Sequence, residues 1–391
     1  SRWWRPQQRR GCSVCARGGG SGNGAAAIGA TAGGGLSNSV DSSSTYASVG
    51  GGRSNTVSAA AYAAIAGGQS NTASAGHSTV GGGTTNTAGG GRCSDAAGNA
   101  DRATCEAITA AVWTVHIAAT VGGGSNNVAS GIAASVAGGS LNRATADYVA
   151  VGGGKSNVAS GDKSTIAGGE GCAATGQLST VSGGENNAAS GSYSAVSGGS
   201  GNTASNTYAA AGGGSGNTAS ATYSVVSGGR QNVASTGAYT TVGGGYGNSA
   251  TGMGSAVAGG QDNTASGDGS AVCGGRNGIS SANFAVVAGG SANTASGLYA
   301  SVGGGNDNSA GAGASVAGGR SNTATGNDAS IGGGATNTAA GLGGVVGGGL
   351  SNRASANYAT CAGGESNTAS GAHATVGGGN TNTASAAHSS A

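Results

Sequence analysis

The 391-residue chain contains 89 glycines but only one phenylalanine and one methionine, too few large apolar side chains to fill a thick globular core at native density. Charged residues make up 7% of the chain and Pro6 is its only proline, which excludes a typical disordered sequence. The formal net charge of +2 excludes a strongly basic surface, so we expect no nucleic-acid partner.

Residues 1–22 differ from the rest of the chain. They carry five arginines and no acidic residue, together with Trp3, Trp4 and the pair Cys12 and Cys15. One CxxC pair, with neither a second pair nor a strand-to-helix context, is weak evidence for zinc or redox chemistry. We interpret this segment as a tail that attaches, contacts a neighbouring subunit or is processed.

Residues 23–391 form a tandem repeat with a period of about 15 residues. Its consensus is Asn-Thr-Ala-Ser-Gly-x-x-Ala-Ser-Val-x-Gly-Gly-x-x, as in Asn293 to Asp307. We number the repeat positions 1 to 15 from the asparagine. The recurrence of this asparagine along the chain gives about 23 turns.

The two halves of the repeat, Asn-x-Ala-x-Gly and Ala-x-Val-x-Gly-Gly, both alternate with period two, which predicts two short β-strands separated by glycine-containing corners. The sequence therefore predicts an all-β fold, a parallel β-solenoid of about 23 coils that stack about 4.8 Å apart. Repeat positions 1, 3, 8 and 10 are expected to point inward, where asparagine forms a structural ladder and alanine faces valine.

One insertion, residues 89–118, interrupts the repeat. It contains Cys93, Cys105 and Trp113. A disulfide between Cys93 and Cys105 is plausible in an oxidising compartment because the loop that it closes is short. Residues 101–119 are expected to form a short helix. The insertion is interpreted either as a binding protrusion or as an inert loop that the repeat tolerates.

Two sets of outward residues form a candidate binding or contact face. Hydroxyl residues at repeat positions 2 and 4 form the first set, and aromatic residues at position 7 form a ladder along one corner. We interpret the aromatic residues as packing or a subunit contact, with a glycan-stacking edge as the alternative. The candidate residues are Thr203, Ser205, Thr218, Ser220, Thr264, Ser266, Thr294, Ser296, Tyr193, Tyr208 and Tyr223.

No arrangement of residues predicts catalysis, a cofactor or a metal site. The acidic residues Asp262, Asp268, Asp307 and Asp328 fall on different coils. We therefore expect that the protein is not an enzyme and that it binds neither a cofactor nor a metal ion.

The remaining cysteines and histidines have structural interpretations. Cys172 and Cys361 fall at inward positions and Cys273 at an outward one, while His373 and His388 share position 7 with the tyrosines. No apolar stretch is long enough to span a membrane, since the nearest, residues 107–121, is short and contains polar side chains.

The half-repeats Asn-Thr-Ala-Ser-Gly and Ala-Ser-Val-x-Gly-Gly resemble those in the head domains of trimeric autotransporter adhesins. This resemblance covers residues 23–391 outside the insertion. It implies a left-handed two-strand β-roll, an extracellular or cell-surface location and self-association as a trimer. It also implies attachment to matrix protein, glycans or other cells. The expected function is an extracellular structural or adhesive repeat protein, either an adhesin head or a subunit of a filament or surface fibre that assembles end to end.

The same half-repeats are also similar to ryegrass-type ice-binding β-rolls, in which flat Thr/Ser ladders order water. The alternative function is therefore an ice-binding solenoid that uses the Thr-Ala-Ser face. Arg143 and Arg353 interrupt the threonine column, and a flat ice-matching face excludes long charged side chains, so this function ranks second.

Overall fold

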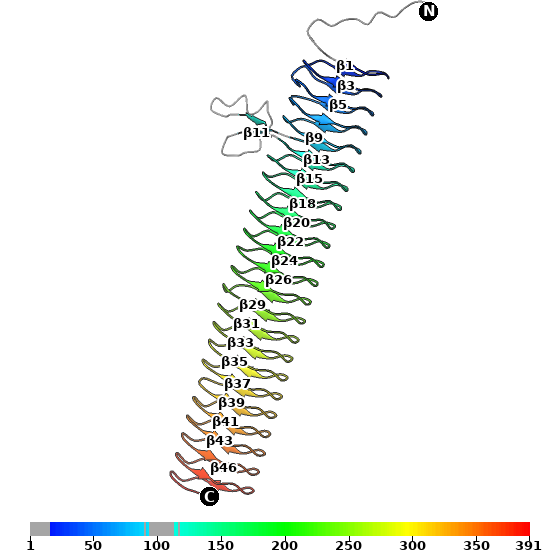
Figure 1. The fold of residues 1–391 in the computed structure, drawn as a ribbon. Coiled ribbons are helices and arrows are strands. Elements are labelled where there is room, and N and C mark those ends of the chain that lie inside the picture. The colour runs from blue at the N-terminus through cyan, green and yellow to red at the C-terminus, as the bar shows by residue number, and fades with distance from the viewer. Residues whose placement is uncertain (1–15, 90, 94–112, 116–117) are drawn as a thin grey trace, which may run out of the picture. The chain divides into compact units, whose positions relative to one another are not determined.

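The computed structural model describes residues 16–89, 91–93, 113–115 and 118–391 (Figure 1). These residues form strands, turns and bends, and none of them lies in a helix. The fold is a parallel β-solenoid of about 23 turns whose strands form two parallel sheets, as the repeat predicts. The chain divides into two compact units, Ser1–Tyr193 (unit 1) and Ser194–Ala391 (unit 2).

Every turn contributes one two-residue strand to each sheet. Sheet I contains the Ala-x-Val half of the repeat, and in unit 1 it comprises β1 (Ala16–Arg17), β3 (Thr31–Ala32), β5 (Ser48–Val49), β7 (Ala64–Ile65), β9 (Thr79–Val80), β13 (Thr120–Val121), β15 (Ser135–Val136), β17 (Ala150–Val151), β19 (Thr165–Ile166) and β21 (Thr180–Val181). Sheet II contains the Asn-x-Ala half, and in unit 1 it comprises β2 (Gly24–Ala25), β4 (Ser39–Val40), β6 (Thr56–Val57), β8 (Thr72–Ala73), β10 (Thr87–Ala88), β14 (Val128–Ala129), β16 (Arg143–Ala144), β18 (Val158–Ala159), β20 (Ala173–Ala174) and β22 (Ala188–Ala189).

Unit 2 repeats this arrangement. Its sheet I strands are β23 (Ala195–Val196), β25 (Ala210–Ala211), β27 (Val225–Val226), β29 (Thr241–Val242), β31 (Ala256–Val257), β33 (Ala271–Val272), β35 (Val286–Val287), β37 (Ser301–Val302), β39 (Ser315–Val316), β41 (Ser330–Ile331), β43 (Val345–Val346), β45 (Thr360–Cys361) and β47 (Thr375–Val376). Its sheet II strands are β24 (Thr203–Ala204), β26 (Thr218–Ala219), β28 (Val233–Ala234), β30 (Ser249–Ala250), β32 (Thr264–Ala265), β34 (Ile279–Ser280), β36 (Thr294–Ala295), β38 (Ser309–Ala310), β40 (Thr323–Ala324), β42 (Thr338–Ala339), β44 (Arg353–Ala354), β46 (Thr368–Ala369) and β48 (Thr383–Ala384).

The register places equivalent repeat positions above one another. Thr323 pairs with Thr338, and Val316 pairs with Ile331 in the opposite sheet. Alanine at position 3 and valine or isoleucine at position 10 are fully buried, as predicted, and the largest fully buried side chains are only Ile65, Ile166 and Ile331. The space between the sheets is thin, which explains why the chain lacks large apolar residues.

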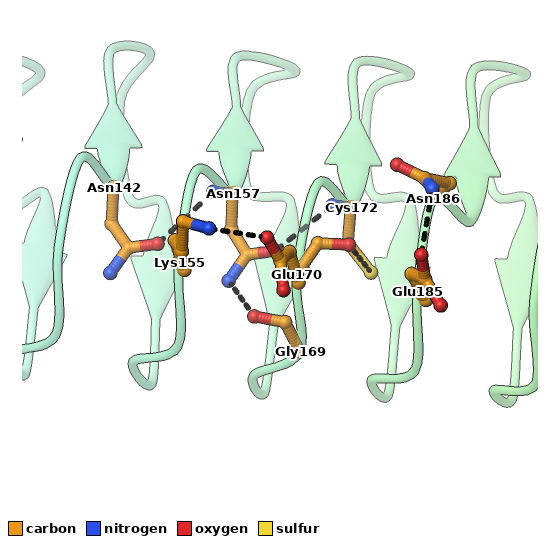
Figure 2. Close-up of polar contacts among 8 residues, drawn as sticks. All are labelled: Asn142, Lys155, Asn157, Gly169, Glu170, Cys172, Glu185 and Asn186. Carbon is orange, nitrogen blue, oxygen red and sulfur yellow. Dashed lines mark hydrogen bonds and ion pairs between the residues drawn. The ribbon is translucent and has the colours of Figure 1, made fainter.

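The asparagines at position 1 form a buried ladder (Figure 2). The amide nitrogen of Asn157 donates to Gly153 O, four residues earlier in the chain, and to Gly169 O, twelve residues later, both at 2.8 Å. The side-chain oxygen of Asn157 accepts the backbone N–H of Cys172 at 2.9 Å. Each asparagine therefore ties one corner to the coil that follows it, in agreement with the predicted structural role.

The corners have left-handed backbone conformations. Residues at positions 7 and 15 have φ between about +50° and +70°, even where they are tyrosine, serine or threonine, as at Tyr223 (φ 56°) and Thr336 (φ 54°). At position 13 only glycine fits. Gly334 has φ 86°, and a Cβ atom there would overlap the carbonyl oxygen of Gly349 in the next coil.

The predicted start of the solenoid needs correction. β1 pairs in parallel with β3, so the solenoid begins by Ala16 and the boundary expected at Asn23 was placed too late. The sequence did not predict this start because the coil that contains Ala16 lacks the position 1 asparagine on which the repeats were aligned.

The insertion leaves the stacking of coils intact. β9 pairs directly with β13, and β10 with β14, across the inserted residues. Within the insertion, β11 (Gly91–Cys93) and β12 (Trp113–Val115) form an antiparallel pair. The helix expected over residues 101–119 is therefore wrong at Trp113–Val115, and residues 101–112 lie outside the described part of the chain. The expected Cys93–Cys105 disulfide involves Cys105, which also lies outside it.

Candidate contact surfaces

The predicted hydroxyl residues all lie on the outer face of sheet II in unit 2. Thr203, Thr218, Thr264 and Thr294 are half-buried, whereas Ser205, Ser266 and Ser296 are exposed and Ser220 is half-buried. Strand alternation produces this arrangement, because positions 2 and 4 flank the buried alanine at position 3. The sequence therefore identified outward residues correctly.

The register brings only some of these threonines together. Thr203 pairs with Thr218, but Val233 follows Thr218, and Ile279 separates Thr264 from Thr294. A longer continuous run of hydroxyls, which the sequence analysis did not single out, comprises Thr294, Ser309, Thr323 and Thr338. The exposed Arg353 ends this run. The four-coil run could have been found by reading position 2 alone as a column.

The outer face of sheet I has a second regular surface that the sequence analysis did not single out. From β3 onward, within each unit, positions 9 and 11 carry no charged residue and no side chain larger than valine. At β39, for example, Ser315 and Ala317 flank the buried Val316 and are exposed. This face is consequently neutral and nearly free of protruding side chains. The restriction of position 11 to Gly, Ala, Ser and Cys is the sequence signal that predicts it.

Several of the aromatic residues at position 7 stack along one corner, and the structure adds members to the column. In unit 2, the rings of Tyr208 and Tyr223 lie 4.9 Å apart and those of Tyr223 and Tyr239 lie 5.1 Å apart, each pair within 3° of parallel. In unit 1, Tyr46 and Tyr62 stack at 5.4 Å. The sequence analysis omitted Tyr46, Tyr62 and Tyr239 because their coils contain one or two extra residues before the corner. Counting backward from the following strand would have found them.

The direction of the stacks restricts what these rings can contact. Within a stack, each ring covers the face of the ring in the preceding coil, so mainly edges and hydroxyl groups are exposed. Where the preceding residue is glycine, the ring covers the backbone instead, as Tyr358 covers Gly343. The packing interpretation therefore describes most of the column, and an open ring face occurs chiefly at the end of a run. The candidate residue Tyr193, at the end of unit 1, is also exposed.

The opposite corner, at positions 14 and 15, carries many of the charged side chains. Lys155 donates to Glu170 one coil away at 2.7 Å (Figure 2). This hydrogen bond, together with the attraction between the charges, raises the pKa of Lys155. Arg230 lies over the Tyr246 ring, 5.4 Å from its centre. Because these groups are exposed, their contribution to stability is small.

The histidines and cysteines in the described part of the chain were the remaining candidates for metal binding. Among the described residues, no three His, Cys, Asp or Glu side chains gather closely enough to hold a metal ion. His373 and His388 stack at 5.0 Å on adjacent coils. Cys172 and Cys361 are buried and Cys273 is exposed, as predicted. Burial raises the pKa of the Cys361 thiol, which keeps this thiol protonated and unreactive.

Comparisons with known proteins find no matching family model and no matching curated protein. Within the described residues, no helix is long and apolar enough to cross a bilayer.

Proposed function

We propose that this chain is an extracellular structural or adhesive repeat protein, either an adhesin head or a subunit of a filament or surface fibre. The observation that carries this proposal is the regular outer surface within each unit. A core of small residues holds every turn in register, and the turns repeat a hydroxyl column, a neutral face and an aromatic corner. Such a surface offers many equivalent weak contacts, which are effective through multivalency rather than through a single pocket.

Self-association is the first part of the proposal, and the neutral face of sheet I is its best contact surface. Charged residues are depleted at the cores of protein interfaces, and this face has none at positions 9 and 11 from β3 onward. From β3 onward, sheet I has nine strands in unit 1 and thirteen in unit 2. At about 4.8 Å per coil and three residues of about 3.3 Å across, the two faces cover roughly 400 and 600 Å². Stable interfaces bury about 800 Å² on each partner. Stable association therefore requires more than the sheet I face of a single unit.

Adhesion is the second part of the proposal. The resemblance to heads of trimeric autotransporter adhesins supports a surface location and a matrix protein or glycan as partner. Exposed hydroxyls on sheet II supply donors and acceptors for either partner. The stacked tyrosines favour contact through ring edges and hydroxyl groups, because their faces are covered within each run.

The test is the solution mass of the full chain by light scattering, with two matched arginine substitutions. Ser315→Arg places a charge on the neutral face of sheet I, whereas Thr323→Arg places one on sheet II, where Arg353 already occupies the same repeat position. We expect an oligomer that Ser315→Arg dissociates and Thr323→Arg leaves intact. Equal effects of the two variants would exclude sheet I as the contact. A monomeric wild-type chain that binds neither immobilised matrix protein nor glycans would exclude the structural and adhesive function.

Ice binding is the second candidate function, and the four-coil hydroxyl run on β36, β38, β40 and β42 favours it. Such a run presents oxygen atoms at a regular spacing along one face. Thermal hysteresis of the wild-type chain is the direct measurement. Hysteresis that Thr323→Arg abolishes and Ser315→Arg preserves would replace the adhesive function with this one.

A further inference from the structure

Among the described residues, each unit contains tyrosines that lie on consecutive coils with their rings in contact. Tyr208, Tyr223 and Tyr239 form one set in unit 2, with centroid separations of 4.9 and 5.1 Å, and Tyr46 and Tyr62 form the other in unit 1 at 5.4 Å. All five rings are between 43% and 60% exposed. Each phenol is therefore both accessible to an external oxidant and adjacent to a second phenol.

We propose that these tyrosine stacks are sites of oxidative cross-linking, at which neighbouring phenols couple to dityrosine. The oxidant is hydrogen peroxide acting through a haem peroxidase. Each of two phenols loses one electron and one proton, and the resulting radicals join through a carbon–carbon bond between ring carbons ortho to the hydroxyls. The two ortho hydrogens then move to the oxygens and restore both phenols. One peroxide is reduced to two waters for each bond formed.

Geometry makes this coupling efficient within a stack. A tyrosyl radical ordinarily has to meet a second radical by diffusion, whereas here the partner ring is held about 5 Å away, so that the step becomes intramolecular. The exposed position of the rings at a corner leaves them free to tilt until two ring edges meet. The shared left-handed backbone at Tyr208, Tyr223 and Tyr239 directs all three side chains to the same side of the corner.

The chain contains its own negative controls. Tyr299 stacks on Phe284, which has no phenol, at 5.4 Å. Tyr148 occupies the same repeat position between Ala133 and Lys163 and has no aromatic neighbour in adjacent coils. Both tyrosines are about as exposed as those in the stacks, at 63% and 59%. Exposure alone therefore predicts equal reactivity for all of them, whereas stacking predicts that only the paired tyrosines couple.

The expected product is a covalent cross-link between side chains of consecutive coils. Each cross-link joins side chains at one corner without altering the buried columns, so the solenoid itself is preserved. Coils that are joined in this way open less readily than their neighbours, and slower amide hydrogen exchange in those coils is the expected result. This inference is independent of adhesion, since it concerns a modification of the corner and not a partner.

The test uses the dilute full-length chain, a haem peroxidase and limiting hydrogen peroxide, followed by trypsin digestion and mass spectrometry. Arg230 lies between Tyr223 and Tyr239, and Arg53 lies between Tyr46 and Tyr62, so each of these cross-links joins two tryptic peptides with loss of two hydrogens. We expect the linked peptides to exceed any product of Tyr299 by about tenfold or more.

Phenylalanine variants distinguish stacking from simple exposure. Phe284 shows that phenylalanine is accommodated at this repeat position, so Tyr239→Phe and Tyr62→Phe preserve the stack and remove one phenol from each pair. Each variant should lose its own linked peptide and retain the other, whereas Tyr299→Phe should change neither. Cross-links distributed equally over Tyr148 and Tyr299, or formed only between separate chains, would overturn the proposal. So would the absence of coupling under conditions in which free tyrosine couples.

Discussion

The asparagine ladder allows a quantitative test at Asn322, whose side chain is fully buried. Its amide nitrogen donates to Gly318 O at 2.9 Å and to Gly334 O at 3.0 Å, and its oxygen accepts the backbone N–H of Asn337 at 3.0 Å. Gly334 O also accepts the N–H of Arg320, so it remains satisfied when the side chain is removed. Asn322→Ala therefore deprives mainly the Asn337 N–H and the Gly318 carbonyl of their partners.

The expected cost follows from these two groups. A buried donor or acceptor that loses its partner costs about 1–3 kcal/mol. The Gly318 carbonyl lies at a half-exposed corner where water replaces part of the loss, so we expect a destabilisation of about 2–4 kcal/mol in total. At about 1.4 kcal/mol for each factor of ten, local opening becomes roughly 30 to 700 times more frequent.

Native-state hydrogen exchange is the appropriate assay, because repeat proteins open locally and a single unfolding midpoint averages over coils. Amides in the coils containing Asn322 and Asn337 should exchange faster by the stated factor. Ser321→Ala is the matched control, since the side chain of this neighbouring corner residue makes only an exposed hydrogen bond to Asp307 and alanine occupies the same position at Ala292. Equal exchange rates in the two variants would refute the stabilising role of the ladder.

Three further substitutions test other parts of the core and one corner. Gly278→Asn should stabilise its coils by about 1 kcal/mol, because Gly278 is the position 1 residue that lacks a side chain and the asparagine restores the ladder. A lower denaturation midpoint would show that the close contact of its Cβ with Asn263 Oδ1, at 3.0 Å, outweighs this gain. Ser255→Ala should leave stability unchanged or raise it by up to about 1 kcal/mol, since the buried Ser255 hydroxyl has no hydrogen-bond partner; a clear loss in urea unfolding would contradict this. Burial disfavours the charged form of Asp41 and so raises the pKa of this carboxyl group. Hydrogen bonds from Ser44, Ala59 and Ser43 have the larger combined effect and lower the pKa below the ordinary 3.8. The folded-state pKa is thus depressed, so Asp41→Asn should destabilise slightly at neutral pH. The difference in unfolding free energy should shrink below about pH 4 and disappear once the pH is below the folded-state pKa.

The interior of each coil followed directly from the sequence. Period-two alternation placed Ala324 and Val316 inside and Thr323 outside, because successive side chains on a strand point to opposite faces. The recurrence of asparagine at steps of about 15 residues also identified position 1 as a structural column. These features depend on residues close in the chain, so local pattern is sufficient to predict them.

Tertiary structure decided everything that depends on which residues become neighbours in adjacent coils. Because coils contain 14 to 17 residues, counting from the asparagine does not always give the structural position of a residue. The paired strands placed Tyr46 and Tyr239 at the aromatic corner. The hydroxyl run through Thr294 and Thr338 and the neutral face of sheet I likewise consist of single residues taken from separate turns.

Backbone pairing also corrected the start of the solenoid at Ala16 and showed that Trp113–Val115 is a strand. By itself the sequence determined the coil, because one coil is a local pattern of period two. The tertiary structure determined how the surfaces align, because hydrogen bonds between coils set the register even where a coil is longer or shorter than 15 residues.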